Sequence, residues 1–425
     1  MEKDKEGIQH NTTAPERTSI MMKRRTWLGG AATAAVVLVQ TAFGKRLQAA
    51  VTQAEKSIQD STKKLGTSPG VLGTRSPFET PHKKPSDTSS RTPLQELYGM
   101  ITPSDLHFER NHGGVPQIDP AHHELMIHGM VEKPMIFTLA ELKRFPSVSR
   151  ICFVECSGNF RGGSETLTPQ EICGLTSQSE WTGVMLSTLF REVGVKSTAT
   201  WFLAEGADAA VMTRSVLVSK GWEDAMIVYA QNGEAIRPEQ GYPLRLLLPG
   251  WEGNTSVKWL RRLELSNQPF MTREETSKYT ESIGDGNVRQ FSFVMDARSI
   301  ITFPAYPAHV ERGWIEIRGL AWSGRGKIQA VEVSTDAGKT WAPARLQDPV
   351  LDKAHTPFRY IWQWNGEETE IMSRAIDETG YIQPTFRQLS DARGGSKGGY
   401  HFNPITAWRV RRTGEVLLQP EAGRK

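Results

Sequence analysis

The hydrophobic pattern of this 425-residue chain changes near residue 280, and this change limits the folds that it can adopt. Between residues 93 and 270, β-rich and helical runs alternate in mixed order, and residues 151–155 and 244–249 are clear strand candidates. Beyond residue 289 the runs are β-rich and are joined by turns. The pattern predicts an α+β domain (93–270), a polar and irregular linker (271–288) and an all-β immunoglobulin-like sandwich (289–425).

The charge of the chain is concentrated at its N-terminus. The sequence has 51 Lys and Arg against 47 Asp and Glu, and its first 50 residues hold eight basic and four acidic side chains. The rest is balanced and carries no basic stripe, so we expect no binding to nucleic acid.

The same 50 residues contain an export signal. Lys23, Arg24 and Arg25 precede an uncharged apolar run of eleven residues, 29–39, which is shorter than the roughly 20 residues that span a bilayer. We interpret residues 1–50 as a twin-arginine (Tat) signal peptide with a long n-region, and residues 51–92 as a flexible leader. The sequence therefore predicts a periplasmic protein without a membrane span, exported folded and carrying a cofactor.

The three cysteines, Cys152, Cys156 and Cys173, allow a disulfide, a metal site or one special thiol. Zinc is poorly supported because His122 and His123 are neighbours and the Cys152–Cys156 spacing lacks the usual pairing of ligands. No C-x-x-C-H motif is present, so we expect no covalently attached c-type haem in this chain.

Cys156 stands where the strand 151–155 gives way to a glycine-rich loop, 156–163. A thiol at such a break, close to backbone amides and to Arg161, suits thiolate formation and metal ligation. A half-buried structural cysteine before a turn is the alternative on residue types alone.

The motifs of the chain resemble those of the sulfite oxidase family of molybdopterin enzymes. The similarity runs from about residue 93 to 412 and is carried by segments 108–112, 156–159, 241–260, 319–324, 331–341 and 374–384. Within that family, segments 155–159, 175–177, 180–183, 237–254 and 272–279 resemble the sulfane dehydrogenases.

The resemblance implies a Mo-molybdopterin cofactor and assigns residues to it. Cys156 would be the only protein ligand of molybdenum. The cofactor contacts that it implies are Phe108, Glu109, Arg110, Asn111, His112, Asp208, Gln240, Arg245, Ser256, Val257 and Lys258. Gln240 stands where sulfite oxidases of the family carry His, which predicts an amide hydrogen bond there.

The resemblance also implies an anion pocket for the substrate. Arg110 and Arg161 match arginines of this pocket, and Trp181 and Tyr279 are candidates for its walls, with core packing as the alternative. Phe160 replaces the first of two family arginines, which is consistent with a substrate that differs from sulfite in size or charge.

The implied activity is molybdenum-dependent oxidation of sulfane sulfur on a carrier protein, as a persulfide or thiosulfonate, with electrons passed to a c-type cytochrome. A homodimer within a heterotetramer is expected, with the cytochrome subunit and the sulfur carrier protein as partners. The alternatives are a sulfite dehydrogenase that converts free sulfite to sulfate, a periplasmic sulfoxide reductase and an exported binding or assembly module.

Overall fold

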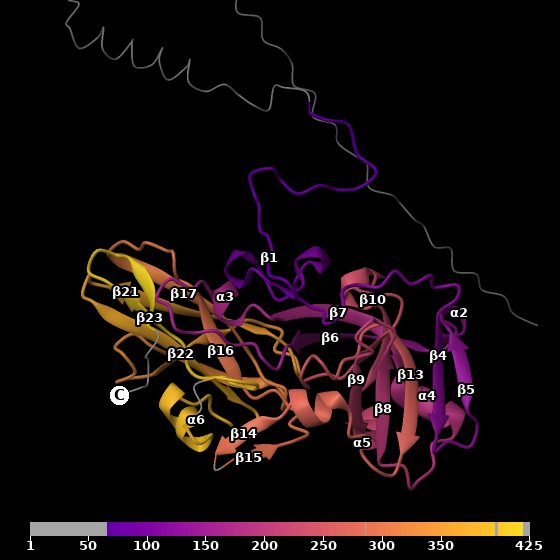
Figure 1. The fold of residues 1–425 in the computed structure, drawn as a ribbon. Helices are drawn as coiled ribbons and strands as arrows, with labels where there is room; N and C mark the ends of the chain where they lie inside the picture. Colours follow the sequence, from indigo (N-terminus) through magenta and orange to yellow (C-terminus); the bar gives the residue numbers. More distant parts are fainter. Residues whose placement is uncertain (1–65, 285, 396–397, 420–425) are drawn as a thin grey trace, which may run out of the picture. The chain divides into compact units, whose positions relative to one another are not determined.

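The computed structural model describes residues 66–284, 286–395 and 398–419 (Figure 1). The twin-arginine segment and the apolar run 29–39 lie outside these residues. Residues 66–74 belong to a separate unit from residues 75–425 and contain no helix or strand. Among the described residues, no helix has both the length and the apolar character needed to cross a membrane.

Two five-stranded sheets form the frame of the first half of the chain. The first has the order β11-β10-β7-β6, with β12 paired to β10, and comprises β6 (Ser147–Glu155), β7 (Thr176–Met185), β10 (Met226–Gln231), β11 (Glu234–Ala235) and β12 (Arg245–Leu247). The second has the order β5-β4-β13-β8-β9 and comprises β4 (Glu124–Gly129), β5 (Met135–Thr138), β8 (Trp201–Gly206), β9 (Thr213–Leu217) and β13 (Leu260–Ser266). Only β4 and β13 run parallel within the second sheet. At the point where β7 meets β10, a Cβ at Gly183 would collide with the Ile227 carbonyl.

Short helices lie between the strands of the first half of the chain. They are η2 (Leu94–Glu96), η3 (Ser104–Leu106), α2 (Leu139–Leu142), α3 (Pro169–Cys173), α4 (Leu186–Val193), α5 (Val218–Glu223) and η4 (Pro238–Gln240). A capping box starts α3, because the Thr168 hydroxyl accepts from the Glu171 amide while the Glu171 carboxylate accepts from the Thr168 amide. Gly194, in the left-handed conformation, ends α4.

Part of the segment expected to be a flexible leader is ordered. Residues 84–91 supply β1 (Lys84–Pro85) and β2 (Ser89–Arg91), which pair with each other, and β2 also pairs with β3 (Glu109–Arg110). The Gln170 side chain holds this sheet by donating to the Arg91 carbonyl at 2.7 Å. This sheet is important for the site because its strand β3 carries Arg110.

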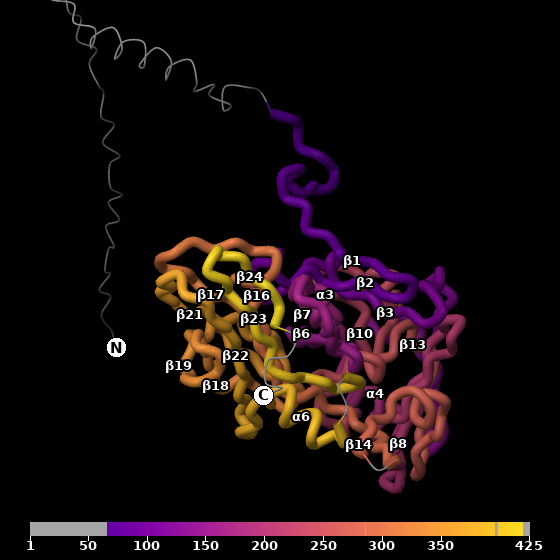
Figure 2. Tube along the Cα trace, turned by 60° about the vertical axis from the view of Figure 1, so that its left-hand side comes forward, coloured from indigo at the N-terminus to yellow at the C-terminus, as the bar shows by residue number. Residues whose placement is uncertain are grey.

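The second half of the chain is built from strands. A four-stranded sheet of order β16-β17-β21-β20 consists of β16 (Arg298–Phe303), β17 (Gly313–Trp322), β20 (Arg345–Leu346) and β21 (Thr356–Trp364). A five-stranded sheet of order β19-β18-β22-β23-β24 consists of β18 (Ile328–Ser334), β19 (Ala342–Pro343), β22 (Thr369–Asp377), β23 (Ala407–Val410) and β24 (Val416–Gln419). Ile315 and Ile317 of β17 face inward while Trp314 and Glu316 face outward. Figure 2 shows these strands grouped beside those of the first half.

Segment 271–288 is not irregular as expected. It contains a π-helix, η5 (Glu274–Lys278), and starts the hairpin of β14 (Glu281–Gly284) and β15 (Asn287–Arg289). Glu275 of η5 is fully buried and forms an ion pair with Arg214. The charged residue in this polar segment therefore belongs to the protein interior and does not indicate a solvent-exposed linker. The second half also contains one helix that its strand pattern does not indicate, α6 (Phe386–Ala392), which starts with a capping box at Thr385.

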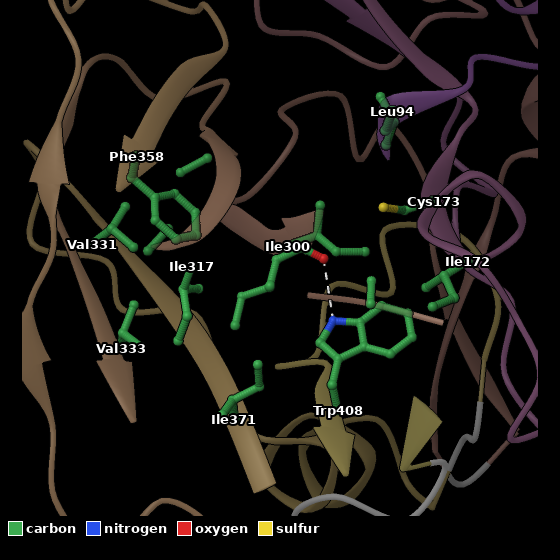
Figure 3. Packing of buried hydrophobic residues seen from close by; sticks show 14 of the residues in the cluster. Leu94, Ile172, Cys173, Ile300, Ile317, Val331, Val333, Phe358, Ile371 and Trp408 are labelled. Carbon is green, nitrogen blue, oxygen red and sulfur yellow. Dashed lines mark hydrogen bonds between the residues drawn. The ribbon is translucent and has the colours of Figure 1, made fainter. Parts of the chain in front are cut away.

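One hydrophobic core joins the two halves (Figure 3). The Trp408 indole donates to the Ile301 carbonyl at 3.2 Å and packs among residues of both C-terminal sheets. Leu94, Ile172 and Cys173 of the first half belong to the same cluster. The two halves therefore share buried apolar surface, and the sheets of the first half also enclose a core of their own.

Candidate active site

Cys156 lies at the wall of a cavity that is lined mainly by loops, among them those between β8 and β9 and between β12 and β13. The Cys156 amide donates to the Leu175 carbonyl at 2.9 Å, and its carbonyl accepts from the Asn159 amide at 3.0 Å. The cavity is lined by Phe108, Arg110, Asn111, His112, Cys156, Asp208, Met212, Gln240, Arg245, Gly253, Asn254, Ser256, Val257, Lys258, Trp259 and Tyr279. The structure thus gathers residues that lie up to 171 positions apart in the sequence around one thiol.

The loop that presents Cys156 is fixed through the preceding residue, Glu155. This carboxylate is completely buried at the end of β6. It accepts from the Asn159 amide group at 2.9 Å and from the Trp322 indole at 2.6 Å, and it lies 3.3 Å from the Arg298 guanidinium. Trp322 and Arg298 belong to the second half of the chain, so both halves determine where Cys156 stands.

Burial raises the pKa of the Cys156 thiol, while a hydrogen bond from the Gly158 amide and the charge of Arg110 lower it. The other two cysteines are completely enclosed. Burial raises the pKa of both Cys152 and Cys173 to about 12, and neither lines the cavity. All three thiols are free.

Three cations line the cavity without a carboxylate partner. Within the described part of the chain, Arg110, Arg245 and Lys258 make no salt bridge and instead donate to carbonyl or amide oxygens. Elsewhere a buried cation is paired: Arg214 contacts both Glu252, at 2.8 Å, and Glu275, at 2.7 Å. Arg245 is buried, and Arg110 and Lys258 are half-buried. Since a charge held away from water without a partner is costly, three such cations around one cavity indicate an anion site.

Arg245 sits at the buried end of this site. Its guanidinium donates to the Gln240 backbone carbonyl at 3.2 Å and to the Gln240 side-chain oxygen at 3.3 Å. Its Nε has no partner among the described residues. Burial lowers the pKa of Arg245 to about 10. The Trp181 ring lies 5.2 Å from its guanidinium carbon and supports it from below.

Lys258 is enclosed by oxygen atoms. Its ammonium donates to the Glu239 carbonyl at 2.9 Å and to the Asn111 side-chain oxygen. Gly241, at φ +113°, lets the backbone pass close to the Lys258 side chain. Burial, followed by the charge of Arg245, lowers the pKa of Lys258 to about 7. An anion bound beside Lys258 and Arg245 would offset both effects.

Tyr279, at the end of η5, forms another part of the wall. The face of its ring lies 4.8 Å from the guanidinium carbon of Arg214, and its hydroxyl lies 3.4 Å from His112 Nε2. Burial raises the pKa of Tyr279, and burial and Arg110 lower that of His112.

Three of the residues predicted for the site do not line the cavity. Glu109 pairs with Lys83 and accepts from the Asn111 side chain at 3.4 Å. Trp181 is completely buried behind Arg245. Arg161 is exposed, and its backbone amide donates to the Ile172 carbonyl at 2.9 Å. The remaining predicted residues all line the cavity.

Some residues at the cavity were not predicted from the sequence, namely Met212, Gly253, Asn254 and Trp259. Asn254 and Trp259 belong to the family-like segment 241–260, so that motif could have indicated them. The Asn254 amide group donates to the Ser157 hydroxyl at 3.2 Å, and its Oδ1 is buried without a partner in the described structure.

The residues present fit a molybdopterin cofactor. The unpartnered Arg245 Nε and Asn254 Oδ1 provide a buried donor and acceptor, Lys258 and Arg245 suit a phosphate, and Cys156 offers a soft thiolate to a metal. No cluster of three or more His, Cys, Asp or Glu side chains that could hold a metal occurs among the described residues. The fold and the site define a protein that binds an anionic redox cofactor beside one cysteine.

Sequence comparison specifies this class further. The "Oxidoreductase molybdopterin binding domain" family model matches residues 112–274, and the "Mo-co oxidoreductase dimerisation domain" model matches residues 289–407. The NADH nitrate reductase of Ulva prolifera is 31% identical over 67% of this chain and 38% of its own length. Chicken (Gallus gallus) sulfite oxidase is 29% identical over 67% of this chain and 68% of its own length.

A solved structure is similar over nearly its whole length. The sulfane dehydrogenase SoxCD from Paracoccus pantotrophus matches with a TM-score of 0.82 and 41% identity, covering 85% of this chain and 97% of the matched chain. This chain belongs to the sulfite oxidase family of molybdopterin oxidoreductases. Its second half is the all-β domain of that fold.

Proposed function

We propose that this protein is a molybdenum-dependent sulfane dehydrogenase. Its substrate would be the terminal sulfane sulfur of a persulfide or thiosulfonate held on a carrier protein, and its electrons would pass to a c-type cytochrome. The observation that carries the proposal is the 41% identity to the chain of a sulfane dehydrogenase over 85% of this chain.

Different residues of the cavity would bind an anionic cofactor and an anionic substrate. Lys258, Arg245, Gln240 and the loop 256–257 would hold the pterin and its phosphate, and Cys156 would bind the metal. When bound, molybdenum supplies two-electron oxygen-atom transfer. A metal cation at the sulfur would stabilise the Cys156 thiolate against burial.

Arg110 would bind the substrate anion near Cys156. Its guanidinium has no carboxylate partner among the described residues, and its nearest protein acceptors are the Asn111 and Thr88 carbonyls at 3.3 and 3.4 Å. Tyr279 and His112 would complete this end and exclude water, which strengthens the charge of Arg110. A single free guanidinium favours a substrate with little charge, such as a sulfane chain.

Sulfite dehydrogenase is the second candidate, with free sulfite as substrate. Relatives named sulfite oxidase, such as those of chicken and Drosophila melanogaster at 29% and 30% identity, favour it. Arg161, which the sequence assigns to the anion pocket, would have to turn toward the cavity for a two-arginine sulfite site.

We further propose the setting in which the enzyme acts. The twin-arginine segment supports export to the periplasm in the folded state. The match to a dimerisation domain supports a homodimer, and the SoxCD similarity supports a separate cytochrome subunit. An immunoglobulin-like topology for the two C-terminal sheets belongs to the same proposal.

The test is metal content followed by activity. The full chain is expressed in a host that makes molybdopterin, as wild type, as Cys156→Ala and as Cys152→Ala, the last being a matched control at a buried thiol. We expect near-stoichiometric molybdenum in wild type and control, and a large loss in Cys156→Ala. Equal metal in all three proteins, or none in the wild type, would contradict the proposal.

Cytochrome c reduction then separates the two candidates. Sulfite and glutathione persulfide serve as electron donors to the metal-loaded enzyme. Turnover of the persulfide with weak sulfite activity supports the sulfane dehydrogenase. Strong sulfite activity without persulfide turnover would assign the protein as a sulfite dehydrogenase.

A further inference from the structure

The second half of the chain places Tyr400 beside Tyr279, which lines the cavity. Its ring centroid lies 5.2 Å from that of Tyr279, with the ring planes tilted by 46°. On the other side, its ring atoms lie 3.8 Å from the position that a Cβ would take at Gly158. Tyr400 therefore packs between a ring that lines the cavity and the loop that presents Cys156.

Interactions with Ser157, Arg393 and Glu252 fix the segment that contains Tyr400. The His401 amide donates to the Ser157 carbonyl at 2.8 Å, which ties this segment to the cysteine loop. Arg393 donates to the Tyr400 carbonyl at 2.6 Å and to the His401 carbonyl at 2.9 Å. The His401 ring lies 3.2 Å from the Glu252 carboxylate.

His401 adopts a conformation that requires this support. Its φ is +52°, in the left-handed region that is unfavourable for a residue with a side chain. Such a conformation persists only where the surroundings fix it, and here the buried His401 is fixed by Ser157, Glu252 and Arg393. The position of the preceding ring, Tyr400, is thus a built feature of the site.

We propose that Tyr400 is a positioning residue that fills the space between Tyr279 and the cysteine loop and narrows the approach to Cys156. The pair admits a slender substrate, such as a linear sulfur chain or a small sulfur oxyanion, and excludes branched or bulky groups. The choice of sulfur compounds as substrate class rests on the proposed function, whereas the narrowing follows from the packing of the two rings.

The reactivity of Cys156 toward thiol reagents of two sizes tests this inference without the cofactor. The full chain is purified from a host that cannot make molybdopterin, so that the thiol is free of metal whatever the function. Iodoacetamide serves as the small reagent and pyrene maleimide as the bulky one, and labelling of each cysteine is followed by peptide mass spectrometry. Cys152 and Cys173 report unfolding, because both are completely enclosed.

Three variants decide the outcome. In Tyr400→Ala we expect the ratio of bulky to small labelling rates at Cys156 to rise on the order of tenfold, because access controls thiol reactivity. Tyr400→Phe keeps the ring and should keep the wild-type ratio. Tyr98→Ala, at a tyrosine that is 82% exposed, is the matched control and should also leave the ratio unchanged.

An unchanged ratio in Tyr400→Ala overturns the inference, and so does a rise in Tyr400→Phe equal to that in Tyr400→Ala. If Tyr400→Ala also labels Cys152 and Cys173, that variant has lost its fold, and Tyr400→Leu replaces it under the same criteria. A failure of the proposed function would appear as missing molybdenum or missing turnover, neither of which enters this measurement.

Discussion

Lys258 is enclosed in the cavity wall, carries a positive charge and has no carboxylate partner among the described residues. These surroundings lower its pKa, and folding stability therefore depends on pH. Its pKa is about 7 in the folded chain, whereas a lysine in the unfolded chain titrates near 10.4. The unfolded chain therefore binds more protons between these two pH values, and folding stability rises with pH across that window.

We predict that this rise disappears in Lys258→Met. Between pH 7 and 10, the free energy of unfolding of the cofactor-free wild type should increase relative to the variant by up to about 1.4 kcal/mol per pH unit. Urea unfolding at three pH values measures the difference. Parallel pH profiles for the two proteins would contradict the assignment of the shift to Lys258.

Arg110 and Arg161 provide a second test at the scale of single residues. Arg110 lines the cavity and Arg161 is exposed away from it. In the loaded enzyme, Arg110→Met should raise the KM for the sulfur substrate by about 10- to 100-fold, since a hydrogen bond to a charged group contributes about 1.5–3 kcal/mol. Arg161→Met should change the KM little, and steady-state kinetics on both variants would show it. An equal effect of the two substitutions would mean that Arg161 turns inward when substrate binds.

At the scale of secondary-structure elements, β6 depends on contacts that its own sheet does not supply. Glu155 ends this strand and is held by Trp322 of β17 and by Arg298 of β16. Loss of one partner of a buried ion pair leaves an uncompensated charge and costs about 3–5 kcal/mol.

We therefore predict that Glu155→Gln destabilises the chain by about 3 kcal/mol, and that Trp322→Phe costs about 1.5–3 kcal/mol through loss of one hydrogen bond to a charged group. Denaturant unfolding of the cofactor-free proteins measures both. Glu367→Gln, at an exposed pair with Arg412, serves as control and should leave the midpoint unchanged. A wild-type midpoint in Glu155→Gln would show that this carboxylate does not hold the two halves together.

Local sequence patterns predict some elements of this fold and not others. The strand expected over residues 151–155 lies within β6 (Ser147–Glu155) and ends at the predicted residue, because a glycine-rich loop follows it directly. The π-helix Glu274–Lys278 was read as irregular, because its buried Glu275 is paired by Arg214 from a distant strand, and no local pattern records that pairing.

The same contrast holds for the site. Arg245 and Lys258 follow from contiguous motifs, and the structure places both at the cavity. Tyr400 was missed because it lies in a glycine-rich loop 244 positions after Cys156, and only the tertiary fold brings the two together. The side of the loop to which Arg161 points depends on backbone turns that residue types do not specify.

At the scale of the whole molecule, the shared core predicts a single unfolding transition. Ile172 of α3 is almost completely buried and packs in one cluster with residues of both C-terminal sheets. Ile172→Ala should cost about 2–5 kcal/mol and lower one common transition for residues 75–425 in calorimetry. Two separate transitions, with only the first one shifted, would show that the halves are energetically independent.

The involvement of both halves at Cys156 also has a consequence for the order of events in biosynthesis. The hydrogen bonds of Glu155 with Trp322 and of Ser157 with His401 can form only after most of the C-terminal half has been synthesised and has left the ribosome. During translation the cysteine loop is synthesised early but lacks these contacts while the last sheet is still being made. We therefore expect the cofactor to be loaded after translation, and a nascent chain arrested before residue 400 should not retain it.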